Sequence, residues 1–247
     1  MLGIIGGTGV TQLSNLEVTR RQMVRTPFGD ASGALTFGKL NGRDVMFLAR
    51  HGYGHTIPPH EVNYRANMWA LQSEGADRIV SVASVGGIRA DMVPGRLVIP
   101  HQILDYTWGR KHTYFEGPDQ QVTHIDFTHP YCPKMRAGLL EAAVDAGQKI
   151  LDGGVYATTQ GPRLETAAEI DRLERDGADM VGMTGMPEAA LAREIGSRYA
   201  AIAVVVNHAA GRGDSEQAIH MDQINEVLQA ALAKVRALLE KFVEKDD

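Results

Sequence analysis

Short apolar runs that break into glycine or small polar residues alternate along the whole chain with longer segments whose apolar residues recur at helical spacing. Strands interleaved with amphipathic helices in this way are typical of an α/β fold, in which helices cover a largely buried sheet. A length of 247 residues is ordinary for one such domain. We therefore predict a single α/β domain over residues 1–247.

The predicted strands are apolar runs rich in β-branched residues. They are Leu2–Ile5, Ala34–Leu40, Asp44–Ala49, Arg78–Ala83, Arg96–Ile99, Gly154–Thr158, Asp179–Met183 and Tyr199–Val206. Several end in small or polar residues, and ligands of such sheets bind in the crevice beyond the strand ends. The residues expected around that crevice are Gly6, Arg50, Ser84, Thr159, Thr184 and Asn207.

The clearest helical pattern covers Met221–Val243, where apolar residues recur every three or four positions. The further predicted helices are Asn63–Glu74, Pro133–Ala146, Thr166–Asp176 and Pro187–Ile195. Thr166 and Glu169 have the spacing of a capping box. Tyr106–Pro133 lacks periodicity, so we expect a long ordered excursion of the kind that is often functional.

Composition narrows the classes of partner. No apolar run approaches the roughly 20 residues that span a bilayer, and the start of the chain lacks the pattern of a secretory signal. We expect a cytoplasmic protein that does not act at a membrane. A net charge of −5 without a long basic stretch argues against a nucleic-acid partner and favours a small-molecule substrate.

Cysteine and histidine patterns give no reason to expect a metal. Cys132 is the single cysteine, which excludes an internal disulfide and a multi-cysteine zinc site, and we expect it to be a packing residue. Six of the nine histidines fall into two loop segments without the helical spacing of a zinc enzyme.

Two segments have the chemistry of an anion site. The first strand breaks into Gly6-Gly7-Thr8-Gly9, where backbone N–H groups can approach an anion and the Thr8 hydroxyl adds a donor. A simple tight turn explains the same glycines. Neither the dinucleotide fingerprint nor the Walker motif is present. Arg50 and His51 follow another apolar strand, and the arginine brings a permanent cation with a fork of donors.

Three further positions could face a ligand. Ser84 lies where a second strand breaks into glycines, Glu165 follows the strand that ends at Thr158, and Asn207 ends the last apolar strand. The side chain of Asn207 can donate and accept hydrogen bonds at once, which suits the edge of a purine. Turn formation at Ser84 and Asn207, and a favourable helix dipole at Glu165, are the alternatives.

Taken together and in order, these segments resemble the methylthioadenosine phosphorylase and purine nucleoside phosphorylase family. The shared motifs are GIIGGTG from Gly3 to Gly9, TPFG at Thr26, LARHG at Leu48, HTIPP at His55, VNYRAN at Val62, GPR at Gly161 and MTGMPEAALARE at Met183. The resemblance implies a mixed sheet flanked by helices and a homotrimer with active sites near subunit contacts. It implies a purine nucleoside and inorganic phosphate as substrates, and no cofactor.

The resemblance also assigns roles to individual residues. The phosphate ligands it implies are Thr8, Arg50, His51, Ser84, the backbone of Val85, and Thr184, while Met183 would meet the ribose hydroxyls. Phosphate would attack the anomeric carbon while the purine leaves. The enzyme must then hold an anion beneath a developing cation and stabilise negative charge on the base.

Departures from the methylthioadenosine enzymes concern the base. This chain has Glu165 in place of a serine of GPRFSS, and Asn207-His-Ala209 in place of an Asp-x-Asp pair. Glu165 can accept the N1–H of a 6-oxopurine, and Asn207 can donate to O6 or N7, so a 6-oxopurine is predicted. A base that leaves a buried donor or acceptor without its hydrogen bond loses about 1 to 3 kcal/mol of binding free energy. Leu164 stands where relatives often have Phe against the base.

The 5′ end of the sugar is the second departure. Enzymes for inosine and guanosine generally place a histidine where this chain has Ile224. Met221 and Ile224 could form an apolar pocket for a methylthio group, with His124 contributed across the subunit contact; both could equally be helix-face core residues.

A 6-oxopurine base on a 5′-methylthio sugar is S-methyl-5′-thioinosine, which becomes the expected substrate. His51, Glu165 and Asn207 are then the expected catalytic residues. The alternatives are an inosine and guanosine phosphorylase, a methylthioadenosine phosphorylase with unusual base contacts, a nucleosidase that uses water, and a nucleoside-binding protein without activity.

Overall fold

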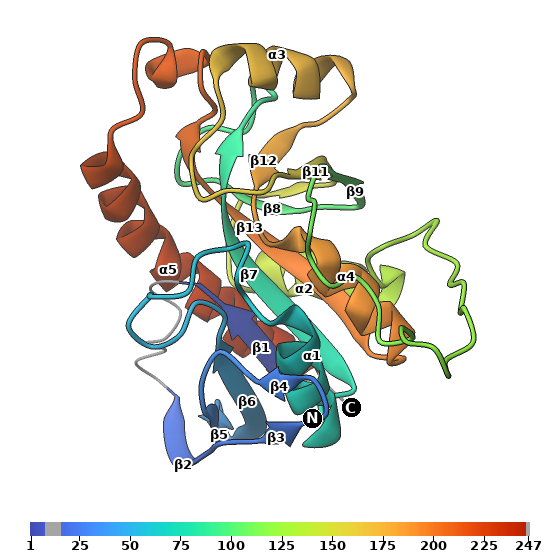
Figure 1. The fold of residues 1–247 in the computed structure, drawn as a ribbon. Coiled ribbons are helices and arrows are strands. Elements are labelled where there is room, and N and C mark those ends of the chain that lie inside the picture. Colours follow the sequence, from blue (N-terminus) through green and yellow to red (C-terminus); the bar gives the residue numbers. More distant parts are fainter. Residues whose placement is uncertain (8–15, 246–247) are drawn as a thin grey trace.

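One sheet of eleven strands runs through the molecule (Figure 1), in a computed structural model that describes residues 1–7 and 16–245. Its main path follows the order β10-β8-β13-β7-β1-β6-β5-β2, and β12, β11 and β9 continue from β7 off this path. The strands are β1 (Leu2–Gly6), β2 (Glu17–Gln22), β5 (Leu35–Leu40), β6 (Arg43–Ala49), β7 (Arg78–Gly87), β8 (Leu97–Ile99), β9 (Gln102–Asp105), β10 (Ile150–Asp152), β11 (Val155–Thr158), β12 (Met180–Gly182) and β13 (Arg198–His208). A separate hairpin joins β3 (Arg25–Thr26) to β4 (Gly29–Asp30).

The four central strands are parallel to one another. β1 pairs in parallel with both β6 and β7, and β13 pairs in parallel with β7. β5 and β2 add antiparallel strands at one edge, and β8 and β12 pair antiparallel with β13 and β7. The sheet is therefore mixed, as expected.

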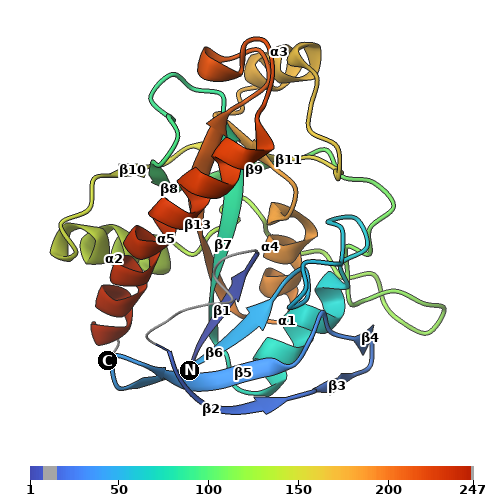
Figure 2. The same ribbon diagram turned by 90° about the vertical axis from the view of Figure 1, so that its left-hand side faces the viewer.

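Helices cover both faces of the sheet. They are α1 (Tyr64–Ser73), α2 (Pro133–Asp145), α3 (Ala167–Arg175), α4 (Gly185–Glu194) and α5 (Met221–Glu244). The core on one face joins α2 and α5 to side chains such as Ile4 and Val82, and α5 crosses in front of the sheet in Figure 2. The core on the other face joins α1 and α4 to Ile5 and Ile79. Successive side chains of β1 therefore point to opposite faces of the sheet and pack into the two cores in turn.

All eight predicted strands exist, with ends that shift by a few residues, but one shift is a correction. β7 does not break at its glycines; it continues through Gly86 and Gly87, where β12 and β13 both pair with it. An added Cβ on Gly87 would lie 1.9 Å from the Met92 carbonyl oxygen. The glycines there permit close packing of a strand rather than a turn.

Five strands were not expected. β2 carries a charged, mostly exposed sequence at the sheet edge, and β3, β4, β9 and β10 are two to four residues long. Such strands have no apolar alternation to detect, because their pairing comes from neighbouring strands rather than from their own side chains.

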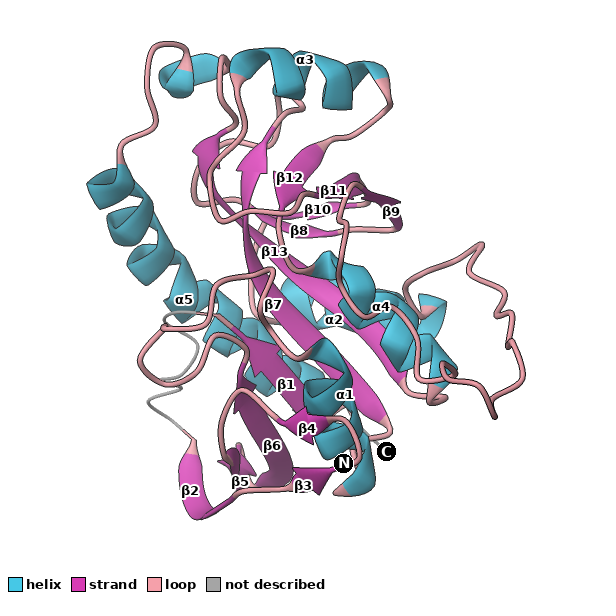
Figure 3. Cartoon of the chain, in the orientation of Figure 1, coloured by secondary structure: helices cyan, strands magenta, loops and turns pink. Residues whose placement is uncertain are grey.

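The five predicted helices are confirmed, and so is the capping box of Thr166 and Glu169. Met186 has an extended backbone inside α4, so that its regular turns begin at Pro187. The segment 106–132 contains no helix or strand and projects as a loop at the right of Figure 3. Within the described residues, no helix is both long and apolar enough to cross a membrane.

A buried ion pair joins the sheet to α4. Arg50, just after β6, donates from Nε and Nη2 to the two carboxylate oxygens of Glu188 at 2.7 and 2.9 Å, and both side chains are at most 1% exposed. Burial alone would lower the pKa of Arg50, but Glu188 outweighs it and raises that pKa above its usual value. The hydroxyl of Tyr199 donates to the same carboxylate at 2.8 Å.

Removing one partner of this pair should be costly, because it leaves the other charge buried without compensation. We expect Glu188→Gln to lower the free energy of unfolding by about 3 to 5 kcal/mol, measured by urea denaturation at pH 7. The control is Glu116→Gln, which breaks the more exposed ion pair with Arg65 and should cost less than about 1 kcal/mol. Equal losses in the two variants would contradict this account of the buried pair.

Candidate active site

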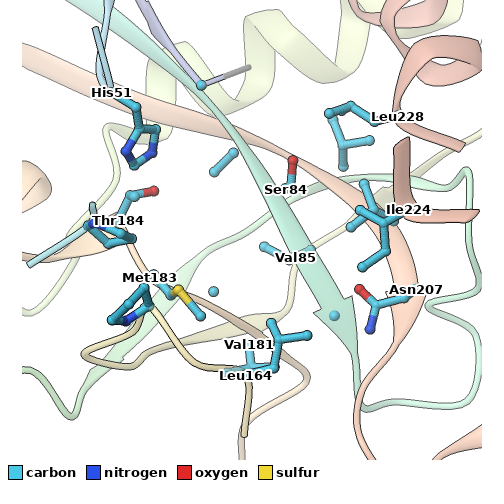
Figure 4. A pocket seen from close by; sticks show the side chains of 18 of the residues that line it. His51, Ser84, Val85, Leu164, Val181, Met183, Thr184, Asn207, Ile224 and Leu228 are labelled. Carbon is cyan, nitrogen blue, oxygen red and sulfur yellow. The ribbon is translucent and has the colours of Figure 1, made fainter. Parts of the chain in front are cut away.

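A cavity of about 660 Å³ opens beside the central strand β7 (Figure 4). From Ile79 to Gly87 every residue of β7 is buried except Ser84, which is exposed because it faces this cavity. The walls come from Gly7 after β1, the loop after β6, the segment 162–165, the turn between β12 and α4, the end of β13 and the start of α5. Most of these segments follow the carboxyl ends of parallel strands, where ligand sites of α/β sheets form.

The cavity brings together most of the site residues expected from the sequence. Those that line it are Arg50, His51, Ser84, Val85, Leu164, Glu165, Met183, Thr184, Asn207, Ala209, Met221 and Ile224. Thr8 lies outside the described residues, although Gly7 before it lines the cavity. His124 is exposed on the excursion between β9 and α2 and does not line the cavity of its own chain.

His51 is held as a neutral ring whose hydrogen is on Nδ1. Its Nδ1 lies 2.8 Å from the carbonyl oxygen of Ile57, and because a carbonyl only accepts, Nδ1 carries the hydrogen. Burial, followed by the charge of Arg50, lowers the pKa of His51 to about 4. In the neutral ring Nε2 is therefore an acceptor.

Most hydrogen-bond donors of the Arg50 guanidinium are used by contacts within the protein. Besides Glu188, its Nη2 donates to Ser81 Oγ at 2.7 Å, and Nη1 donates to the Val82 carbonyl at 3.2 Å. Nη1 has two hydrogens, and within the described residues it has this one acceptor, so one hydrogen remains for an anion. Arg50 thus offers less to a phosphate than an unpaired arginine would.

Two hydroxyls complete the anion end. The hydroxyl of Ser84 makes no hydrogen bond to the described part of the chain, and Figure 4 shows this side chain between His51 and Asn207. Thr184 is the N-cap residue of α4, and its side chain does not cap the helix. Because the regular turns of α4 begin only at Pro187, the Thr184 hydroxyl rather than the helix dipole is the group that would meet an anion.

Glu165 and Asn207 line the cavity with unused hydrogen-bonding capacity. Oε1 of Glu165 accepts from Thr159 Oγ1 at 2.6 Å, while Oε2 accepts no hydrogen bond from any described residue. Asn207 donates one Nδ2 hydrogen to the His208 carbonyl at 2.6 Å. Its other Nδ2 hydrogen and its Oδ1 have no partner in the described chain.

An irregularity of β13 aims Asn207 into the cavity. Val205 pairs with Val85 and Asn207 with Gly86, so Val206 is an extra residue between them. Side chains alternate between faces along a regular strand, yet Val206 and Asn207 both line the cavity. A β-bulge redirects a side chain in this way.

The wall opposite His51 is mainly apolar. Ile219, Met221, Ile224 and Leu228 come from the start of α5 and the residues before it, and Figure 4 shows Ile224 and Leu228 across β7 from His51. Asn225 is the polar member of this wall. Ile224 also packs against the core, so its two expected roles are compatible.

Sequence reasoning assigned no positioning role to the three residues that hold the site residues in place. Ile57, Thr159 and Glu188 hold His51, Glu165 and Arg50, respectively. Glu188 is 138 positions from Arg50, so spacing carried no signal, although both fall within motifs already identified. No group of three or more potential metal-binding side chains occurs in residues 1–7 and 16–245.

The low pKa of His51 should make stability depend on pH. Its pKa is about 4 in the folded chain against about 6.5 unfolded, so between these values the unfolded state binds more protons. Stability then falls as the pH drops through this window, by about 2 to 3 kcal/mol at pH 4.5. We expect His51→Gln to remove this part of the difference in unfolding free energy between pH 7 and 4.5.

The matched control is His129→Gln at an exposed loop position, which should keep the pH dependence of the wild type. If His51→Gln kept it as well, His51 would not be the neutral buried ring described above.

Comparison with known proteins places this architecture among nucleoside phosphorylases. A probable S-methyl-5′-thioinosine phosphorylase of Pseudomonas syringae pv. tomato is 53% identical over 240 residues, covering 97% of each chain. A probable 6-oxopurine nucleoside phosphorylase of Dictyoglomus turgidum is 46% identical over 244 residues, covering 99% of this chain and 91% of the other.

Solved structures give the same result for the fold. The methylthioadenosine phosphorylase of Schistosoma mansoni in complex with adenine superposes with a TM-score of 0.93 at 34% identity, covering 98% of this chain and 90% of the other. The family model described as the phosphorylase superfamily matches residues 1–244. With this match over nearly its whole length, the chain belongs to the phosphorylase superfamily.

Proposed function

We propose that the protein catalyses the reversible phosphorolysis of S-methyl-5′-thioinosine to hypoxanthine and 5-methylthioribose 1-phosphate. The observation that carries this proposal is a single cavity with an anion end at His51 and Thr184, one carboxylate at Glu165, and an apolar wall around Ile224. The relatives named above as thioinosine and 6-oxopurine phosphorylases support the same substrate class.

At the anion end, phosphate would take hydrogen bonds from Ser84, Thr184 and the remaining hydrogen of Arg50. Because Nε2 of His51 is an acceptor, the bound ion would be hydrogen phosphate with its hydroxyl directed at that nitrogen. This contact fixes the orientation of the nucleophile, and orientation supplies much of the rate enhancement in such displacements. The GGTG turn with Thr8 would add its backbone donors.

At the base end, a 6-oxopurine suits the hydrogen-bonding groups better than adenine does. Among the described cavity residues Glu165 is the one carboxylate, and its Oε2 is available to accept N1–H. Ala209 presents only a methyl group, so no second carboxylate stands beside Asn207 to accept an exocyclic amine. Asn207 would donate to O6 or N7 and stabilise the negative charge that grows on the leaving base. Leu164 would pack against the ring.

At the sugar end, Met183 would meet the ribose hydroxyls, while Met221 and Ile224 would receive the 5′-methylthio group. A 5′-hydroxyl against this wall would lose its hydrogen bonds to water, which disfavours inosine. Inosine and guanosine phosphorolysis is the second candidate, because Asn225 lies in the same wall and could bond a hydroxyl.

We further propose a homotrimer in which His124 of a neighbouring subunit closes the sugar end. The exposure of Met221, 58% of its surface, supports a cover from outside the chain. Cytoplasmic location and catalysis without a metal or organic cofactor complete the proposal. The cavity supplies an oriented nucleophile and donors for the leaving base, which is the assistance this displacement requires.

The test compares kcat/KM for methylthioinosine, inosine, guanosine and methylthioadenosine, each with and without phosphate. Methylthioinosine should be the preferred substrate, and omitting phosphate should abolish turnover. A preference for methylthioadenosine would contradict the assignment of Glu165 and Asn207. Turnover without phosphate would instead indicate a nucleosidase, and binding without product would indicate an inactive nucleoside-binding protein.

Replacing Ile224 tests the sugar end. We expect Ile224→His to shift the ratio of kcat/KM for methylthioinosine over inosine towards inosine by about 10- to 100-fold, because a hydrogen bond to the 5′-hydroxyl replaces an apolar contact. Ile224→Val is the control, since it keeps the wall apolar and should keep the ratio. If the histidine variant keeps it too, the methylthio group binds elsewhere.

A further inference from the structure

Arg110 is a buried arginine in the excursion between β9 and α2. No part of the proposed mechanism uses this side chain. It is 8% exposed. Its Nη1 donates to the carbonyl oxygens of Met183 and Met186 at 2.8 and 2.6 Å and to Tyr64 Oη at 3.2 Å. Its Nη2 donates to the carbonyl oxygens of Thr159 and Gln160 at 3.2 and 2.9 Å.

None of these five acceptors is a carboxylate, and Arg110 forms no ion pair with the described part of the chain. A buried cation normally has an anionic partner, because desolvation is expensive. Here convergent carbonyl oxygens take that place. An arrangement that directs four backbone carbonyls at one guanidinium fixes the backbone segments that carry them.

Each of these segments belongs to the cavity. Thr159 and Gln160 lead into the loop that carries Leu164 and Glu165. Met183 and Met186 flank Thr184, the N-cap residue of α4. One guanidinium therefore connects the proposed base loop to the proposed phosphate turn.

Tyr64 extends the connection to a third loop. Its hydroxyl accepts from Arg110 and donates to the carbonyl of Pro59 at 2.9 Å. Pro59 belongs to the cavity loop in which the Ile57 carbonyl accepts from His51. The chain of contacts thus ends at the ring proposed to orient phosphate.

We propose that Arg110 is a positioning residue. It fixes the relative positions of three cavity segments: the base loop that follows Gln160, the phosphate turn at Thr184, and the His51 loop that contains Pro59. The assignment of base and phosphate ends rests on the proposed function. Arg110 acts through these backbones and does not itself line the cavity. Its loss should weaken the binding of nucleoside and phosphate together, whereas loss of a direct ligand weakens chiefly the substrate it touches.

Only arginine fits this role. Its planar group presents donors in fixed directions that reach Met183 and Gln160 from two different nitrogens. A lysine ammonium is a compact point charge with three donors, so it can serve one side of the connection but not both. Arg110→Lys should therefore retain the positive charge but no longer fix the relative positions of the cavity segments.

The experiment compares Arg110→Met and Arg110→Lys with the wild type, using the nucleoside that the wild type turns over best. We expect KM to rise for both nucleoside and phosphate and kcat/KM to fall by about 100-fold in Arg110→Met, the scale of a 1 Å misplacement. Arg110→Lys should recover the KM of one substrate but not of both. Unchanged KM values in Arg110→Met would overturn the proposal.

Arg136→Met is the matched control. Arg136 on α2 also donates to backbone carbonyls, those of Ile99 and Pro100, and in addition to the carboxylate of Asp152, and it does not line the cavity. Its loss should lower the melting temperature without changing either KM. If Arg110→Met matched it in both respects, Arg110 would be a structural residue only, and the inference would fail.

Tyr64→Phe keeps the inference testable if Arg110→Met does not fold. It removes one hydroxyl and should raise the KM for phosphate while leaving that for the nucleoside unchanged; no change in either would overturn the link to His51. Calorimetric binding of phosphate and of hypoxanthine to each variant gives the same comparison without turnover. If the wild type bound phosphate and hypoxanthine but did not catalyse phosphorolysis, the proposed function would fail, while the role of Arg110 could still be tested by binding.

Discussion

The parallel pairing of β1 with β6 on one side and β7 on the other is the constraint on which the site depends. It brings Gly7, Arg50 and Ser84 to one end of the sheet, although they are far apart in the sequence. β13 adds Asn207 to the same end through its parallel pairing with β7. Because the strands are buried on both faces, they cannot slide in register without exposing core side chains, so the positions of these residues are fixed by the core.

Two buried arginines serve this end of the sheet in different ways. Arg50 is paired with the carboxylate of Glu188, which leaves it a modest capacity to bind an anion. Burial and the charge of Arg50 keep His51 neutral by lowering its pKa. Arg110 has carbonyl oxygens as its partners and so defines backbone positions. The ion pair of Arg50 sets the charge at the anion end, and the carbonyl contacts of Arg110 set the positions of the backbone segments around the cavity. A site that holds a mobile anion against a nucleoside needs both.

Much of the site was predictable because its residues lie at the ends of apolar strands. His51, Thr184 and Asn207 were identified in that way, and the cavity contains them. The expectation that β7 breaks at Ser84 was wrong, because the strand continues through its two glycines, and Gly87 permits the close approach of Met92 rather than a turn. The predicted roles of Glu165 and His124 depend on a bound ligand and a neighbouring subunit, and they stay predictions.

By itself, the sequence determined the class of fold, the helices and most strands, since these follow from local periodicity, and it determined which motifs hold polar groups at strand ends. Tertiary structure alone decided what those groups can do. The bulge that turns Asn207 inward and the contacts of Arg110 join segments distant along the chain. The carbonyl of Ile57 sets the tautomer of His51 from within one loop, but the burial that keeps the ring neutral comes from the fold around it. Their physical reason is non-local: hydrogen-bond direction and burial depend on neighbours that only the folded chain supplies.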